Sequence, residues 1–278
     1  MKLRVSGLWV DVGNVIELLN HPGHADQKSH GRKKSGGDHE VRDALAGAGT
    51  IGAISRAAAA EAKRITGRDI LFEMDGSDPQ TAREHAEGVL QGLERFPAAN
   101  LGRVSVARLG PTTYAHADGN TIVFNSTYAS RAGRAEYLKS LAVDVRGWDE
   151  GLQVYGISAL KMSGFHTRNS GSPTAVALHE FGHVMDIATT HRRSGPRVDE
   201  IVQRATKREQ AKQTVPGSPV SGSGDLVLRT VSGYAMTNRT ELIAEAFTDV
   251  MVNGSGASSV SRDIFGVLED SYNASHGR

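Results

Sequence analysis

The sequence predicts an α+β fold in which a few long helices pack against one small twisted sheet. Apolar residues recur at helical spacing in several long segments, whereas strand-like runs are short and confined to the middle of the chain. The 278 residues suggest one or two domains, and an apolar content of 38% supports a modest core. The 32 glycines exceed the usual ~7% and leave room for flexible segments.

Two helices and two strands are expected in the first half of the chain. An alanine-rich helix is expected over 51–66. The glycine pattern that leads into it (47–52) matches a nucleotide-binding loop only formally, because no strand precedes it. A second helix is expected over 79–95, with Asp78 as its N-cap. Short strands are expected at 104–107 and, after a turn signal, at 121–124. Residues 138–163 show no clear pattern.

Three further helices are expected in the second half. The first runs from 173 to about 190 with Ser172 as N-cap, the second over 196–213, and the third over 240–252, with a loop at 215–224. Gly182 lies inside the first of these helices, where glycine costs about 1 kcal/mol relative to alanine. We therefore expect close packing there, against the sheet or the next helix. The chain divides into a short N-terminal segment (1–19), a disordered linker (20–50), a helical lead-in (51–76), a globular domain (77–253) and a flexible tail (254–278).

The most specific motif is H-E-x-x-H, formed by His179, Glu180 and His183. Residues four apart share a helix face, so the two histidines can bind one metal ion while Glu180 lies beside it, where a bound water would be. Their neighbours are apolar, and buried histidines need partners. The chain has no cysteine, so any zinc must be held by histidine, aspartate or glutamate. The sequence therefore predicts a Zn²⁺ site on this helix.

A catalytic zinc needs a third protein ligand. Glu241 and Glu245 share one face of an otherwise apolar helix, and a buried carboxylate needs a cation or donor. Glu241 is the candidate third ligand, with Glu245 supporting the ligands from one turn below. The alternative is a solvated helix with two surface glutamates. Asp186, one turn after His183, is a candidate acceptor that fixes an imidazole tautomer.

H-E-F-G-H, followed by S-x-Y, T-N and E-x-x-A-E-A-F, resembles the catalytic domain of the anthrax lethal factor group of zinc metallopeptidases. It is also similar to zincin domains encoded beside bacteriophage head proteins. The resemblance covers about 172–251 and implies zinc ligands at His179, His183 and Glu241. It further implies Glu180 as general base and Tyr234 as oxyanion stabiliser. The chain departs by one extra residue, Gly233, between the serine and the tyrosine.

The resemblance implies a zincin-like fold: a small mixed sheet, the H-E-x-x-H helix and a following glutamate helix. It implies a gluzincin-like zinc metalloendopeptidase that acts on a peptide or protein, which an edge strand such as 121–125 could align. A second similarity, of residues 21–32 to tails of phage head proteins, points to a phage or prophage product with head proteins as possible partners. The alternatives are a head assembly protein with an accessory zincin domain and a secreted toxin.

The charge and hydropathy of the chain give no sign of other partners. The net charge of +1 does not indicate nucleic acid. No apolar run reaches the ~20 residues of a membrane span, and no secretory signal is visible. We therefore expect a location in the bacterial cytoplasm or in the virion.

Overall fold

The computed structural model describes residues 2–5, 8–11, 43, 45–144, 165–189, 194–212 and 227–277. The chain forms two compact units, residues 1–34 and 35–278. In the first, β1 (Lys2–Val5) and β2 (Leu8–Asp11) pair as an antiparallel hairpin in which Val5 lies opposite Leu8. This hairpin lies in the segment that the sequence left without an assigned element.

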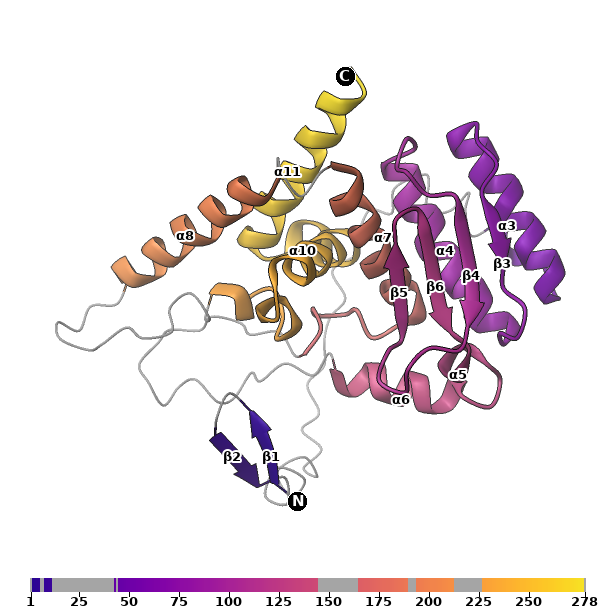
Figure 1. Ribbon diagram of the computed structural model, residues 1–278, viewed down its shortest axis with the longest axis horizontal. Coiled ribbons are helices and arrows are strands. Elements are labelled where there is room, and N and C mark those ends of the chain that lie inside the picture. Colours follow the sequence, from indigo (N-terminus) through magenta and orange to yellow (C-terminus); the bar gives the residue numbers. More distant parts are fainter. Residues whose placement is uncertain are drawn as a thin grey trace. The chain divides into compact units, whose positions relative to one another are not determined.

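The second unit is built on a mixed sheet of four strands in the order β3-β4-β6-β5 (Figure 1). β3 (Leu71–Glu73), β4 (Arg103–Ala107) and β6 (Thr121–Asn125) run parallel, and β5 (Ala115–Asp118) pairs antiparallel with β6. Val104, Ile122 and Phe124 are fully buried, so one face of the sheet packs into the core. The α+β class is therefore confirmed.

Helices α3 (Ile51–Thr66) and α4 (Pro79–Arg95) come first, and α4 lies behind the sheet in Figure 1. Both begin as the sequence predicted. Thr50 caps α3, and the Asp78 carboxylate accepts from two backbone N–H groups of α4. After the sheet come α5 (Ser126–Ala129) and α6 (Arg134–Asp144), which the sequence did not predict.

The second half of the unit is helical: α7 (Pro173–Thr189), α8 (Ser194–Lys212), the 3₁₀ turn η2 (Tyr234–Met236), α10 (Arg239–Asn253), the turn η3 (Gly254–Gly256) and α11 (Ser259–Ser275). α7 packs between α4 and α10, and α11 packs on α10 and α8. Phe96, Phe181, Phe247 and Phe265 join these helices through ring contacts of 5.5–5.9 Å. The helices predicted over 173–190, 196–213 and 240–252 are confirmed. No described helix is both long and apolar enough to cross a membrane.

Four expectations need correction. The strand over 121–125 is internal to the sheet, because β5, unrecognised in the sequence, pairs along its outer side. The segment 254–278 is no flexible tail: α11 buries Val260, Ile264, Phe265, Val267, Leu268 and Tyr272. The segment 51–76 is not a separate lead-in, since α3 and β3 contribute to the same core as the rest of the unit. Leu45 and Ala48, at the end of the expected linker, are buried too. The end of the expected N-terminal segment (12–19), most of the expected linker (20–42), most of 138–163 and the loop at 215–224 lie outside the described residues.

Candidate metal centre

Helix α7 brings the two motif histidines together. The Ser172 hydroxyl accepts from the N–H of Ala175 at 3.2 Å and so caps the helix as predicted. One turn apart on the same face, His179 and His183 direct their Nε2 atoms at each other, 3.1 Å apart. Two imidazole nitrogens in this arrangement can share one cation.

Glu241 reaches the same point from α10. Asn238 caps that helix by accepting from the N–H of Glu241 at 3.0 Å, which places the residue in the first turn. Oε2 of Glu241 lies 3.1 Å from Nε2 of His179 and 3.3 Å from Nε2 of His183. The three residues predicted as ligands thus converge on one point.

The close approach of α7 and α10 depends on Gly182. A Cβ at this position would lie 2.9 Å from Cα of Ala244 and 3.2 Å from Cβ of Phe247, both on α10. Such contacts are too short for carbon atoms, so a side chain here would separate the helices. Helix α10 is therefore the reason for the glycine. The expected close packing is present, but its partner is neither the sheet nor the next helix along the chain, which is α8.

The donor atoms fit a zinc ion. A tetrahedral zinc with nitrogen and oxygen ligands at ~2.0–2.2 Å separates its ligands by roughly 3.3–3.5 Å. The observed separations between the donor atoms, 3.1, 3.1 and 3.3 Å, are close to these ligand–ligand distances. Three protein ligands also leave a fourth position for water or substrate.

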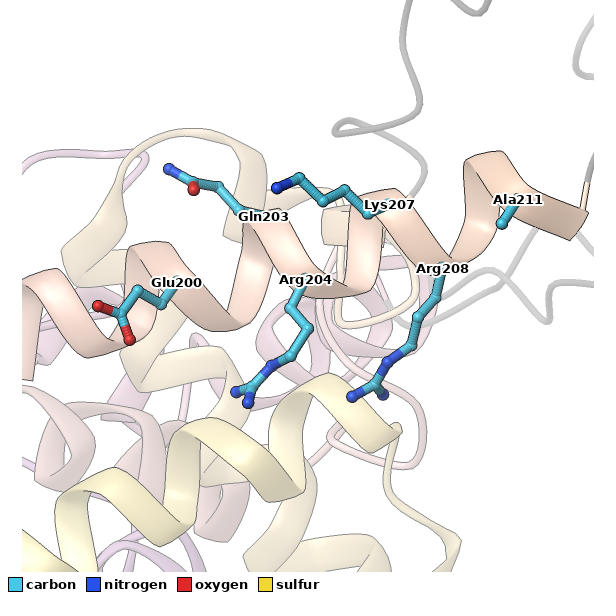
Figure 2. A pocket seen from close by; sticks show the side chains of 6 residues that line it. All are labelled: Glu200, Gln203, Arg204, Lys207, Arg208 and Ala211. Atoms are coloured by element: carbon cyan, nitrogen blue, oxygen red, sulfur yellow. The ribbon is translucent and has the colours of Figure 1, made fainter.

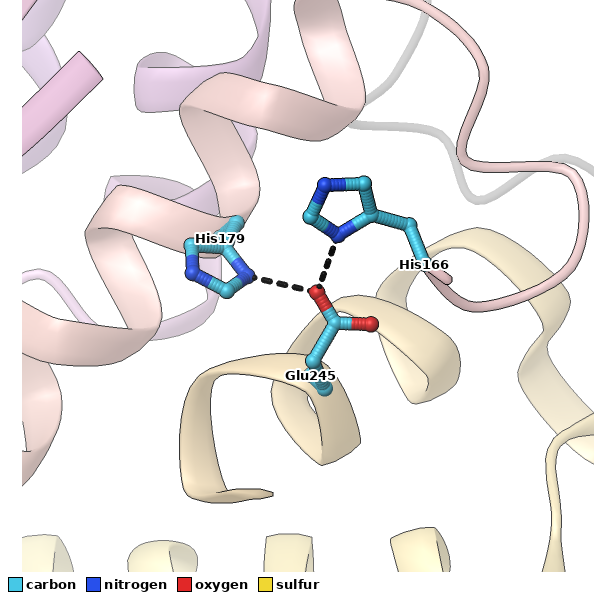
Figure 3. A group of neighbouring side chains, drawn as sticks. All are labelled: His166, His179 and Glu245. Atoms are coloured by element: carbon cyan, nitrogen blue, oxygen red, sulfur yellow. Dashed lines mark hydrogen bonds and ion pairs between the residues drawn. The ribbon is translucent and has the colours of Figure 1, made fainter. Parts of the chain in front are cut away.

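A second group of metal-compatible residues shares His179 (Figure 3). Glu245, with 1% of its side chain exposed, lies with Oε1 2.8 Å from Nδ1 of His166 and 2.9 Å from Nδ1 of His179. Its Oε2 accepts from the backbone N–H of Thr167 at 2.9 Å. Hydrogen bonds thus satisfy this carboxylate without an ion, and we assign it the supporting position behind His179 that the sequence predicted.

The carboxylates of Glu241 and Glu245 favour a positive charge at the centre. Burial lowers the pKa of His179, but the hydrogen bond to Glu241 and the neighbouring Glu245 carboxylate outweigh burial and raise that pKa to about 10. Burial raises the pKa of both glutamates, and their bonds to histidines outweigh it and hold both pKa values well below the usual range. A proton on His179, or a metal ion in its place, balances these carboxylates.

Glu180 follows His179 on α7 and is buried, with 6% of the residue exposed. Burial raises its pKa, and the neighbouring His179 and His183 counteract part of that rise. A buried carboxylate with a raised pKa beside a metal-binding group is suited to take up and return a proton.

Tyr234 lies on η2, at the edge of the same centre. Its ring stacks on His179 with centroids 5.8 Å apart and planes 25° apart. Burial, and then the charge of Glu241, raise the Tyr234 pKa to about 12, so the hydroxyl stays protonated and can donate. Asp186 is buried on α7. Nδ1 of His179 faces Glu245, so the tautomer role predicted for Asp186 can concern only His183 and stays a prediction.

Sequence reasoning missed His166. This residue lies in the irregular stretch before α7, and no spacing rule relates it to the motif. Its contacts to Glu245 and to the rings of Tyr234 and His179 exist only in the folded chain.

A hollow on α8 lies apart from this centre (Figure 2). Its lining side chains are Glu200, Gln203, Arg204, Lys207, Arg208 and Ala211, all from one helix face. They include no histidine and only one carboxylate, so this hollow has no metal-ligating set.

Comparisons of the chain with protein-family models, curated proteins and solved structures found no match. The arrangement of the side chains therefore carries the functional argument.

Proposed function

We propose that this chain is a zinc-dependent metalloendopeptidase of the zincin type. The observation that carries the proposal is the convergence of His179, His183 and Glu241 at separations of 3.1–3.3 Å, close to the edges of a zinc tetrahedron. The adjoining buried Glu180 supports it, since such a centre needs a proton acceptor.

Each residue has a distinct part in peptide hydrolysis. His179, His183 and Glu241 would hold the ion, which when bound lowers the pKa of a coordinated water from 15.7 to about 7. Glu180 accepts the proton of the attacking water and delivers it to the leaving amine. Tyr234 donates a hydrogen bond to the carbonyl oxygen of the scissile bond as that oxygen gains charge.

The edge strand β5 is the candidate aligner of the substrate. It borders the sheet and contacts α7. Burial raises the pKa of Glu180, and His116 on β5 is among the groups that lower it, so the strand runs close to the proposed base. An extended peptide could pair by β-augmentation with the outer side of β5, which pairs with no other strand among the described residues, the role first expected for 121–125. The phage setting rests on the sequence resemblance alone.

A peptide-library digest with and without a zinc chelator tests the proposal. We expect cleavage that is lost with the chelator and restored by added zinc. Glu180→Gln should keep one zinc per chain yet lose cleavage, because the amide cannot accept the proton. Glu136→Gln, an exposed glutamate on α6, is the matched control and should cleave normally. Cleavage by Glu180→Gln at the normal rate would remove the basis of the assignment.

A further inference from the structure

His166 lies where three elements of the centre meet. Its backbone N–H donates to the carbonyl of Asp144 at the end of α6, at 3.0 Å. The preceding residue, Phe165, accepts from the N–H of Tyr234 at 2.7 Å. The His166 ring lies 5.3 Å from that of Tyr234 and 6.0 Å from that of His179, edge to face in both cases. The residue is therefore held in place by neighbours on both sides of the metal centre.

The His166 side chain acts on Glu245. Nδ1 of His166 forms a hydrogen bond with Oε1 of the carboxylate at 2.8 Å (Figure 3). The backbone N–H of Thr167 donates to Oε2 at 2.9 Å. Both contacts have the distance and the direction of a hydrogen bond. Nδ1 of His179 lies 2.9 Å from Oε1 of Glu245, within hydrogen-bond distance, but the two groups are not oriented as a hydrogen bond requires. The two bonds from the 166–167 segment therefore fix the carboxylate, and His179 contacts an acceptor that is already in place.

The same segment is anchored further along α10. Asn253 donates to the carbonyl of Arg168 at 2.9 Å, and the Asn169 amide donates to Oδ1 of Asn253 at 2.7 Å. Glu245 and Asn253 are eight residues apart and so face the same side of α10. The segment before α7 is thus attached at two positions, Glu245 and Asn253, to α10, the helix that also carries Glu241.

We propose that His166 is a positioning residue of the metal centre, which holds the Glu245 carboxylate against Nδ1 of His179 and thereby directs Nε2 of His179 toward the ion. The proposal rests on the proposed zinc site, but not on peptide cleavage. An acceptor behind a metal-bound imidazole sets its tautomer and orientation, and loss of such support costs ~10–100-fold in metal affinity.

Two substitutions separate the ring of His166 from its hydrogen bond. His166→Phe keeps the aromatic contacts to Tyr234 and His179 but removes the donor. His166→Asn loses the ring, yet its side-chain amide can place a donor near the former Nδ1. If His166 positions Glu245, the Asn variant, which keeps a hydrogen-bond donor, should retain zinc affinity and the Phe variant should lose it. If His166 only fills space, the Phe variant, which keeps an aromatic ring, should retain zinc affinity and the Asn variant should lose it.

The test is a zinc titration of the full chain against a competing chelator, with thermal unfolding as a check on folding. We expect His166→Phe to bind zinc about 10-fold more weakly, and His166→Asn to stay within ~3-fold of the unchanged chain. The cobalt(II)-loaded Phe variant should have an altered visible spectrum. His276→Phe, at the far end of α11, is the control and should bind normally. If the Phe variant does not fold, His166→Ala takes its place with the same expectation.

The outcomes separate this inference from the proposed function. Equal affinity of the unchanged chain and His166→Phe, or an equal loss in the Phe and Asn variants, would overturn the role of His166 and leave the zinc site standing. Failure of the unchanged chain to bind zinc would overturn both. Zinc binding without peptide cleavage would contradict the proposed peptidase alone.

Discussion

Replacing Gly182 by alanine tests whether helix packing sets the geometry of the metal centre. The new Cβ would lie 2.9 Å from Cα of Ala244, whereas carbon atoms in contact lie about 3.5–4.0 Å apart. Relief of this overlap requires α7 and α10 to separate by roughly 0.6–1.1 Å. The histidines lie on α7 and Glu241 on α10, so the distances of 3.1 and 3.3 Å between them grow with the separation.

The far side of α7 offers little room for retreat. A Cβ on Gly92 of α4 would meet the Phe181 ring at 2.6 Å, and one on Gly88 would meet the Thr174 carbonyl at 2.3 Å, so α4 is already pressed against α7. Because functional constellations tolerate only about 0.5 Å of displacement, we expect Gly182→Ala to lose at least ~10-fold in zinc affinity. Overpacking lowers the free energy of unfolding by about 1–3 kcal/mol, and the better helix propensity of alanine raises it by about 1 kcal/mol.

Chelator competition measures the zinc affinity, and urea unfolding of the zinc-free protein measures the stability. Gly266→Ala in α11 is the matched control, because a Cβ there meets nothing within 4 Å. We expect it to leave the zinc affinity unchanged and to raise the free energy of unfolding by up to about 1 kcal/mol. Unchanged zinc affinity in Gly182→Ala would refute the argument that this glycine sets the distance between the ligands.

Two further predictions concern Tyr234 and His85. Tyr234→Phe removes the proposed donor to the oxyanion but no metal ligand, so kcat should fall ~100-fold with zinc content and KM nearly unchanged; a normal kcat would exclude the role. His85 is buried with its ring stacked on Phe124 at 3.7 Å, and burial, then the charge of Arg134, lower its pKa to about 3. The unfolded chain, with a histidine pKa near ~6.5, binds more protons below that pH, so stability is retained above pH 6.5 and falls by up to ~1.4 kcal/mol per pH unit below it. His85→Gln should flatten this dependence in urea unfolding between pH 7.5 and 5, and an equal slope in both proteins would contradict it.

The parts of the fold that local patterns determine could be predicted. α4 begins with Asp78 and Pro79, and α7 begins after Ser172. These capping residues lie at the helix ends themselves, so the local sequence indicates where each helix begins. The four-residue spacings of His179 with His183 and of Glu241 with Glu245 mark shared helix faces. The two pairs were joined in the sequence by the need of a catalytic zinc for a third protein ligand, because the glycine at 182 did not indicate which helix packs against it.

The parts that depend on distant partners could not be predicted. β5 reads Ala-His-Ala-Asp, a poor strand sequence, and forms because it pairs with β6. β3 has only three residues and lies beside β4. The place of His166 beside the centre shows only through its hydrogen bond to Glu245, which is 79 residues away in the sequence. The last helix, α11, is a different case: its apolar residues 260, 264, 267 and 268 have helical spacing, but the glycine- and serine-rich stretch before it suggested a flexible tail.

X-ray absorption at the zinc edge of the purified full chain tests the central claim most directly. The account predicts one zinc per chain with four nitrogen or oxygen neighbours at ~2.0–2.2 Å, among them two imidazole rings. His183→Ala should lose the ion or have one imidazole fewer. A chain without stoichiometric zinc, or a zinc with only oxygen neighbours, would contradict the proposed His179, His183 and Glu241 centre.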